Sequence, residues 1–135
     1  MIGLVVLILM SFGCAKIEQS DIFQILDVQI RELGLMPDGT IRILLQPLYG
    51  YSNSTNEIVV VEENWVINGV SVQIYEFETL APTGSLFKEE WDHFSLQHFL
   101  PKGTKEVEVS GTFRALYPSG TIIALMKTKK IPITW

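Results

Sequence analysis

Two histidines are the first side chains in this sequence that could do chemistry. His93 and His98 stand five positions apart, so they face opposite sides of a strand and point in clearly different directions on a helix. We therefore expect them not to bind a metal ion together. Asp92 precedes His93, but adjacent residues do not normally point at each other, which argues against an acid–base pair. The histidine pattern predicts neither a catalytic residue nor a metal site.

Four glutamates form the second candidate group. Glu76 and Glu78 share one face of an expected strand, and Glu62 and Glu63 lie on the partner strand. Paired carboxylates can hydrolyse glycosides or bind Ca²⁺. No Asp-x-Asp loop supports a calcium site, and the spacing implies no deep acid–base site. We interpret the group as a solvated acidic sheet face.

Aromatic side chains beside small polar residues are candidates for partner binding. Tyr49 and Tyr51 open the polar stretch 52–56, and Trp91 lies in a second aromatic stretch. Exposed rings can fill a partner's pocket or stack on a sugar, and loops on rigid scaffolds often carry binding. We predict partner-binding roles for Tyr49, Tyr51 and Trp91. The alternative is that one tyrosine packs at a sheet edge beside a flexible loop.

A single cysteine, Cys14, follows an apolar segment. One cysteine excludes an intrachain disulfide and a multi-cysteine metal site. Residues 2–10 are almost entirely apolar, and the small residues Ser11 and Gly13 follow them, which is typical of a secretory signal. As a helix, residues 2–15 would reach about 21 Å, short of the roughly 30 Å hydrocarbon core of a bilayer. The segment is therefore too short to span the membrane as a helix.

The stretch Ser11-Phe12-Gly13-Cys14 resembles the lipobox of bacterial lipoprotein precursors, in which a small residue directly precedes the cysteine. The resemblance implies that Cys14 receives a diacylglyceryl thioether and becomes the mature N-terminus. It further implies a signal peptide over 1–13 and a lipidated tether over 14–21. Acyl chains contribute about 0.8 kcal/mol per buried CH₂, so several of them anchor a protein stably. An ordinary secretory signal or an uncleaved anchor is the alternative.

Length and charge limit the rest of the chain. All 10 basic and 15 acidic residues lie beyond residue 13, and the formal net charge is −5. Nucleic-acid affinity depends on Lys and Arg that neutralise phosphates, so an acidic domain argues against such a partner. A chain of 135 residues suits one domain plus an appendage, and we place that domain at 22–135.

Short β-branched runs separated by turn residues predict an all-β domain. Turn chemistry recurs at Pro37-Asp38-Gly39, Asn68-Gly69 and Pro118-Ser119-Gly120, where Pro or Asn-Gly favours hairpins. The expected strands are 22–32, 40–48, 57–67, 70–79, 93–100, 105–116 and 121–133.

The last hairpin has the clearest alternation of apolar and polar residues. A three-residue loop at 118–120 sets the register that we expect. Opposite charges then face each other on its outer side, which favours the pairing. The expected pairs are Phe113 with Leu125, Ala115 with Ile123, and Glu108 with Lys130.

The domain resembles immunoglobulin-like and fibronectin-like sandwiches at two places. In the run Trp65-Val66-Ile67-Asn68-Gly69, the tryptophan resembles the inward-facing tryptophan that these sandwiches carry on a central strand. Residues 100–104 resemble the link before the penultimate strand. The resemblance implies an immunoglobulin-like antiparallel β-sandwich of about seven strands, preceded by an N-terminal hydrophobic signal or anchor helix. Within 85–99, aromatic residues at helical spacing predict a helical turn or two near 86–92 that runs into a strand.

The sequence contains no Gly-rich phosphate loop, nucleophile elbow or zinc spacing. We therefore expect no enzyme activity and no cofactor. The combined expectation is a lipid-anchored exported protein of the cell envelope, facing the periplasm or the exterior. It would act as a non-catalytic binding, assembly or structural module, attached to the membrane by its lipid, with another envelope protein or a glycan as partner. The alternative is a small exported enzyme or enzyme inhibitor that uses the 85–99 segment.

Overall fold

A computed structural model describes residues 20–73, 78–93 and 96–134. The expected signal peptide, the N-terminal helix, Cys14 and most of the tether therefore lie outside the described residues. Within those ranges, no helix is long and apolar enough to cross a bilayer.

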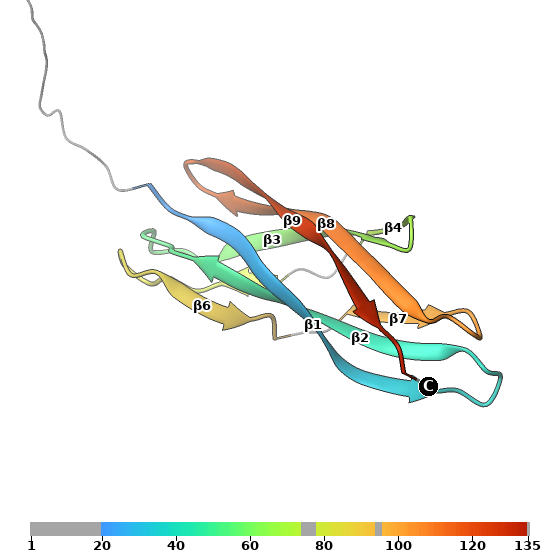
Figure 1. Ribbon diagram of the computed structural model, residues 1–135. Coiled ribbons are helices and arrows are strands. Elements are labelled where there is room, and N and C mark those ends of the chain that lie inside the picture. Colours follow the sequence, from blue (N-terminus) through green and yellow to red (C-terminus); the bar gives the residue numbers. More distant parts are fainter. Residues whose placement is uncertain (1–19, 74–77, 94–95, 135) are drawn as a thin grey trace, which may run out of the picture.

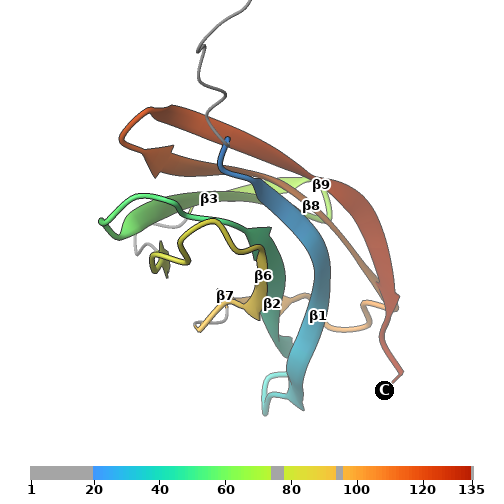
Figure 2. The same ribbon diagram turned by 90° about the vertical axis from the view of Figure 1, so that its left-hand side faces the viewer.

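Two antiparallel sheets packed face to face form the domain (Figure 1, Figure 2). In the first sheet, β2 is central and pairs with β1 on one side and with β6 and β7 on the other. In the second, the order is β4-β3-β8-β9, and β5 also pairs with β3. The strands of the first sheet are β1 (Phe23–Leu35), β2 (Ile41–Tyr51), β6 (Lys88–Trp91) and β7 (Leu96–Leu100). Those of the second are β3 (Val59–Ile67), β4 (Val70–Gln73), β5 (Glu78–Leu80), β8 (Glu106–Tyr117) and β9 (Gly120–Pro132). The expected all-β sandwich of two antiparallel sheets is confirmed.

Alternating burial places the core between the sheets. Along β2 and β3, nearly every second side chain is buried, as expected for strands with one face in a core. Trp65 is fully buried on β3, and its ring meets that of Phe113 edge-on at a centroid distance of 5.3 Å. The inward orientation expected for this tryptophan is confirmed.

The expected turns join the hairpins. Gly39 has a φ of +91°, and Asn68 and Gly69 have φ values of +48° and +81°, which is the left-handed backbone that Asn-Gly hairpins require. In the last hairpin, Tyr117 pairs directly with Gly120. The loop therefore holds two residues rather than the expected three.

This shorter loop shifts the register of the last hairpin. Phe113 pairs with Ala124 and Ala115 with Ile122, so the expected partners Leu125 and Ile123 are wrong. A shift of one residue exchanges the faces of a strand, and Ile123 and Leu125 accordingly point outward, 60% and 73% exposed. The expected pair of Glu108 with Lys130 is confirmed, because an irregularity farther along the hairpin, between Val109 and Gly111 on β8, restores the register.

Of the expected strand 70–79, the structure describes β4 and β5, and residues 74–77 lie outside the described residues. The edge of the first sheet is interrupted between β6 and β7. β6 lies where a helical turn was expected, so the helical turn is wrong. The cause in the first sheet is Pro47, which lies between the β2 segments that pair with β6 and β7. The Pro47 carbonyl accepts the Asp92 N–H at 2.9 Å. The Pro47 nitrogen carries no hydrogen, so it cannot donate the second hydrogen bond that a continuous neighbouring strand would receive.

Candidate functional site

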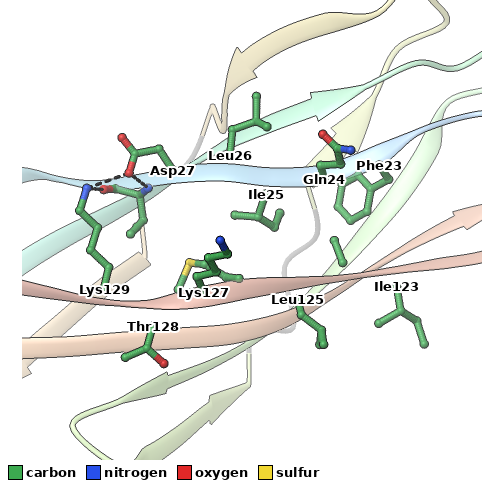
Figure 3. A pocket seen from close by; sticks show the side chains of 13 residues that line it. Phe23, Gln24, Ile25, Leu26, Asp27, Ile123, Leu125, Lys127, Thr128 and Lys129 are labelled. Carbon is green, nitrogen blue, oxygen red and sulfur yellow. Dashed lines mark hydrogen bonds and ion pairs between the residues drawn. The ribbon is translucent and has the colours of Figure 1, made fainter.

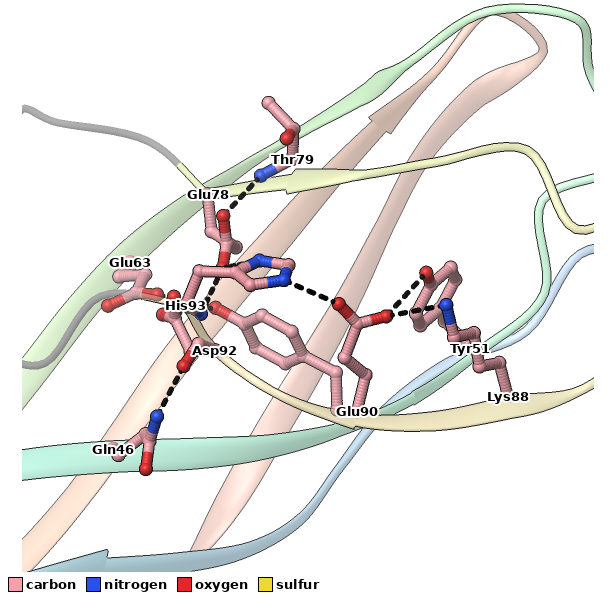
Figure 4. Close-up of polar contacts among 10 residues, drawn as sticks. Gln46, Tyr51, Glu63, Glu78, Thr79, Lys88, Glu90, Asp92 and His93 are labelled. Carbon is pink, nitrogen blue, oxygen red and sulfur yellow. Dashed lines mark hydrogen bonds and ion pairs between the residues drawn. The ribbon is translucent and has the colours of Figure 1, made fainter. Parts of the chain in front are cut away.

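Three carboxylic acids are buried between the sheets beside this interrupted edge (Figure 4). They are Glu63 on β3, Glu78 at the start of β5 and Asp92 just after β6. The solvated acidic face expected for this region is wrong at Glu63 and Glu78, which are both buried. Glu76 lies outside the described residues. Alternation along β3 turns Glu63 to the same side as Trp65. Glu62 points the other way and forms a 3.2 Å ion pair with Arg114.

Glu63 is held by two donors from the core. The hydroxyl of Tyr49 donates to Oε2 of Glu63, and Nε1 of Trp65 donates to Oε1 at 2.8 Å. The same tyrosine hydroxyl lies 3.2 Å from Oδ2 of Asp92. Burial, followed by the charges of Glu63 and Asp92, raises the pKa of Tyr49 well above its ordinary value. The tyrosine therefore remains a hydrogen-bond donor between two carboxyl groups.

Glu78 connects this core group to the surface. Its Oε2 accepts the backbone N–H of His93 at 2.5 Å and lies 3.1 Å from Nδ1 of that residue, while Oε1 accepts the Thr79 N–H at 3.0 Å. Burial acts to raise the pKa of Glu78. Hydrogen bonds with Asp92, His93 and Thr79 and the His93 charge outweigh that effect, so the pKa is lowered. Nε2 of His93 lies 2.9 Å from Glu90.

The resulting chain of groups runs from a buried tyrosine to an exposed imidazole. The His93 side chain is 64% exposed, while its partner Glu78 is buried. Such a series can hold and exchange protons. Among the residues that the structure describes, no group of three or more His, Cys, Asp or Glu side chains is arranged to hold a metal ion. His98 lies apart from this series on β7, opposite Ile43, and burial lowers its pKa.

The expectation that Tyr49 and Tyr51 are exposed partner-binding residues is wrong. The strand β2 continues through both, and each is only 1% exposed. The Tyr49 ring packs against Phe23 at a centroid distance of 5.6 Å. The Tyr51 hydroxyl lies 3.3 Å from Glu90, and burial raises its pKa to about 12.

The polar stretch after these tyrosines is fastened to the domain. Asn53 is fully buried, and its Nδ2 donates to the carbonyl groups of Glu57 at 2.8 Å and Leu80 at 3.1 Å. The backbone N–H of Ser54 donates to Asp21 at 2.8 Å. These bonds fasten the loop to the domain, whereas the alternative interpretation expected a flexible loop.

Trp91 is the one aromatic candidate that remains near the surface. It lies half-buried at the end of β6, paired with Leu48. Next along β2, a Cβ added to Gly50 would come within 2.7 Å of Phe87 and 2.8 Å of Leu26, so these two side chains cover the glycine. Leu26, Leu48, Phe87 and Trp91 form an apolar surface that we call the outer-face patch. Sequence reasoning missed three of the four, although the glycine in a long strand was a signal of close contact.

The strands β1 and β9 run side by side in the same direction (Figure 1). A groove lies between them (Figure 3). It has a volume of about 810 Å³ and is lined by residues 23–28 and 123–129. Phe23, Val28, Ala124 and Met126 are its buried side chains. The sequence predicted both strands but not the space between them, because that space depends on how the sheets pack.

One end of the groove is closed by an ion pair. Nζ of Lys129 lies 2.7 Å from Oδ1 of Asp27 and donates to the Val28 carbonyl at 2.9 Å. The hydrogen bond from Lys129, aided by the Val28 N–H, lowers the pKa of Asp27. Toward the other end, Ile123 and Leu125 stand exposed on β9.

Comparisons with known proteins add little to this geometry. No protein-family model matches the chain, and no curated protein matches it. Among solved structures, the X-ray structure of Northeast Structural Genomics Consortium target SoR45 is similar over 84% of this chain and 87% of that chain. The sequence identity is 17% and the TM-score is 0.47. Similarity at this level supports no argument about function.

Proposed function

We propose that this chain is a lipid-anchored exported protein of the cell envelope, whose sandwich is a non-catalytic module for binding another envelope protein. The fold proposal that goes with it is an immunoglobulin-like or fibronectin-like topology. It is supported by the order β1-β2-β6/β7 in one sheet and β4/β5-β3-β8-β9 in the other, and by the inward Trp65 on a central strand.

The position of exposed apolar side chains carries the binding proposal. Ile22 and Leu26 flank the start of β1, Phe87 covers Gly50 beside Leu26, and Ile123 and Leu125 lie across the groove on β9. Clusters of exposed apolar side chains rimmed by polar residues mark interaction sites on soluble domains. Leu26 and Phe87 lie on the outer face of the first sheet, and Ile123 and Leu125 on that of the second (Figure 3). The two groups flank the β1/β9 groove at the end where the chain enters the sandwich.

The proposed anchor would hold this end of the domain close to the membrane. If Cys14 carries the lipid, the tether 14–21 reaches at most about 26 Å at ~3.3 Å per residue. The apolar end is then the part of the sandwich nearest the bilayer. A partner that binds there is itself a protein at the membrane surface.

Radiolabelled palmitate tests the anchor. We expect label in the wild-type protein and none in Cys14→Ala, because the thiol is the acylated group in the resemblance that supports the proposal. Label that persists in Cys14→Ala would place acylation elsewhere. An unlabelled wild-type protein with its leader removed would show ordinary secretion.

A site-specific photo-crosslinker tests the surface. We expect a crosslinker in place of Leu26 to trap a defined envelope protein, and one in place of Leu35 to trap none. Leu35 is an exposed leucine at the other end of the same strand, so the comparison controls for exposure. Equal yields from both positions would contradict a binding surface at the end near the tether.

The enzyme alternative has one observation in its favour. His93 contacts Glu78 and Glu90, and Glu78 is hydrogen-bonded to Asp92, so acid and base groups do converge near 85–99. We rank it second because Glu63, Glu78 and Asp92 are buried and engaged with protein donors. Hydrolysis of envelope substrates that is lost in His93→Ala, with an unchanged melting curve, would reverse this ranking.

A further inference from the structure

The start of β9 has the composition of a strand covered on both faces. Residues 122–126 read Ile-Ile-Ala-Leu-Met, and continuous apolar runs of this kind belong to strands with a covering layer on each side. Ala124 and Met126 are covered by the core, whereas Ile123 and Leu125 are exposed. This run therefore offers apolar surface on the outer face that the described domain leaves open.

The same run is also open along its edge. Within the described residues, β9 pairs only with β8 and β1 pairs only with β2. Each strand thus turns a row of backbone donors and acceptors toward the groove between them. Unpaired edges are templates for an added strand. A lipid chain cannot satisfy these groups, but a polypeptide backbone can.

The charged side chains of β9 indicate which kind of polypeptide would bind in the groove. Lys129 is bonded to Asp27, while Lys127, which also lines the groove, has no ion-pair partner among the described residues. Lys130 follows on the same strand. In an antiparallel pair of two β9 edges over residues 122–127, Lys127 of each copy would face the apolar Ile122 of the other, so self-pairing offers Lys127 no opposite charge. An acidic residue in the occupant would instead complement Lys127.

We propose that the β1/β9 groove binds an extended segment of a partner protein, which adds as a strand to the edge of β9 over residues 122–127. The segment carries apolar side chains that cover Ile123 and Leu125 on one face and enter the groove on the other. It places an acidic side chain beside Lys127. This inference rests on the proposed binding role and specifies the chemistry of the partner.

Peptide selection on the full-length protein in detergent micelles tests the inference. Ten-residue random peptides are displayed and selected, and the recovered peptides are synthesised. We expect apolar residues at alternate positions and one Asp or Glu. Leu125→Lys should weaken their binding at least tenfold, whereas Leu86→Lys should leave it unchanged. Leu86 is a matched control because both leucines are 73% exposed.

Backbone methylation separates strand addition from simple apolar contact. N-methylation of peptide residues whose N–H faces β9 should abolish binding, and methylation at the intervening residues should leave it intact. Lys127→Glu should select peptides with Lys or Arg in place of the acid. Melting curves of all three variants establish that each is folded.

Three results would overturn the inference. They are recovery of no binding peptide, binding that is indifferent to which amides are methylated, and a wild-type protein that dimerises through β9 or binds phosphatidylglycerol vesicles through Leu125 instead. The palmitate experiment on Cys14 is independent of all three. Failure of strand addition therefore leaves the proposed anchor and the outer-face patch to be judged separately.

Discussion

The hydroxyl of Tyr49 on β2 donates a hydrogen bond to the carboxylate of Glu63 on β3, so one buried contact joins the two sheets. We expect Tyr49→Phe to lower the free energy of unfolding by about 1–3 kcal/mol, because the change leaves a buried acceptor without its donor. Tyr51→Phe should cost less, since the hydroxyl of Tyr51 lies 3.3 Å from the partly exposed Glu90. Urea denaturation measures both. Equal losses would show that the Glu63 contact contributes nothing of its own.

Gly111 on β8 is predicted to be a position where no side chain fits. A Cβ there would approach the Asn64 carbonyl oxygen to 2.8 Å and Phe113 to 3.0 Å, and the backbone atom cannot turn aside. We expect Gly111→Ala to destabilise the domain by about 1–3 kcal/mol through overpacking. Gly34→Ala is the control, because a Cβ at Gly34 meets nothing within 4 Å. There we expect a neutral or slightly stabilising change, measured by thermal unfolding.

His98 should make stability depend on pH. Burial lowers its pKa below the ordinary value of 6.5, so the unfolded chain takes up the proton first as the pH falls. The domain keeps its full stability, as far as His98 is concerned, above pH 6.5. That contribution is lost as the pH falls through the folded-state pKa of His98. In His98→Gln we expect a smaller loss of stability between about pH 7 and pH 5 than in the wild type. Parallel pH profiles for the two proteins would contradict this assignment.

The turn between β3 and β4 depends on the asparagine at its first corner. Asn68 has a φ of +48°, and its Oδ1 accepts the Glu108 N–H at 2.8 Å. We expect Asn68→Ala to cost about 1.5–3 kcal/mol, the sum of the left-handed backbone strain and a lost hydrogen bond. Asn68→Gly loses the hydrogen bond to Glu108, but glycine adopts the left-handed backbone without strain. Its loss of unfolding free energy should therefore be smaller than that of Asn68→Ala. If alanine and glycine cost the same in urea denaturation, the strain is absent.

Features set by short stretches could be predicted from the sequence. The turns at Gly39 and Asn68, the inward Trp65 and the two-sheet architecture depend on local φ preferences and on alternation, both of which are visible in the residues. The register of the last hairpin was harder to predict from the sequence. A loop shorter by one residue moved Leu125 to the outer face, and only the irregularity near Val109 restored the pair of Glu108 with Lys130.

The candidate site depended on contacts that are distant in sequence. Tyr49, Glu63 and Asp92 come from three strands or strand ends, and the sequence alone does not show that they meet. Polar residue type suggested solvent for Glu63, but the strand phase turned it inward. A clearer signal was Pro47, whose missing N–H in a central strand indicates an interrupted neighbour. That interruption is where the buried acids lie.

The place where the chain enters β1 sets the direction in which a pull on the preceding chain would load the domain. The pairing of β1 with β2 extends from Phe23–Tyr51 to Leu35–Ile41, and the preceding chain leaves from the Phe23 end. Tension transmitted from a membrane and directed along β1 would stress this whole ladder in shear, with many hydrogen bonds sharing the force at once. The same tension applied across the strand would peel them apart singly. If the proposed anchor holds the N-terminus, force that pulls along β1 would meet the shear resistance of this ladder and not its weaker resistance to peeling.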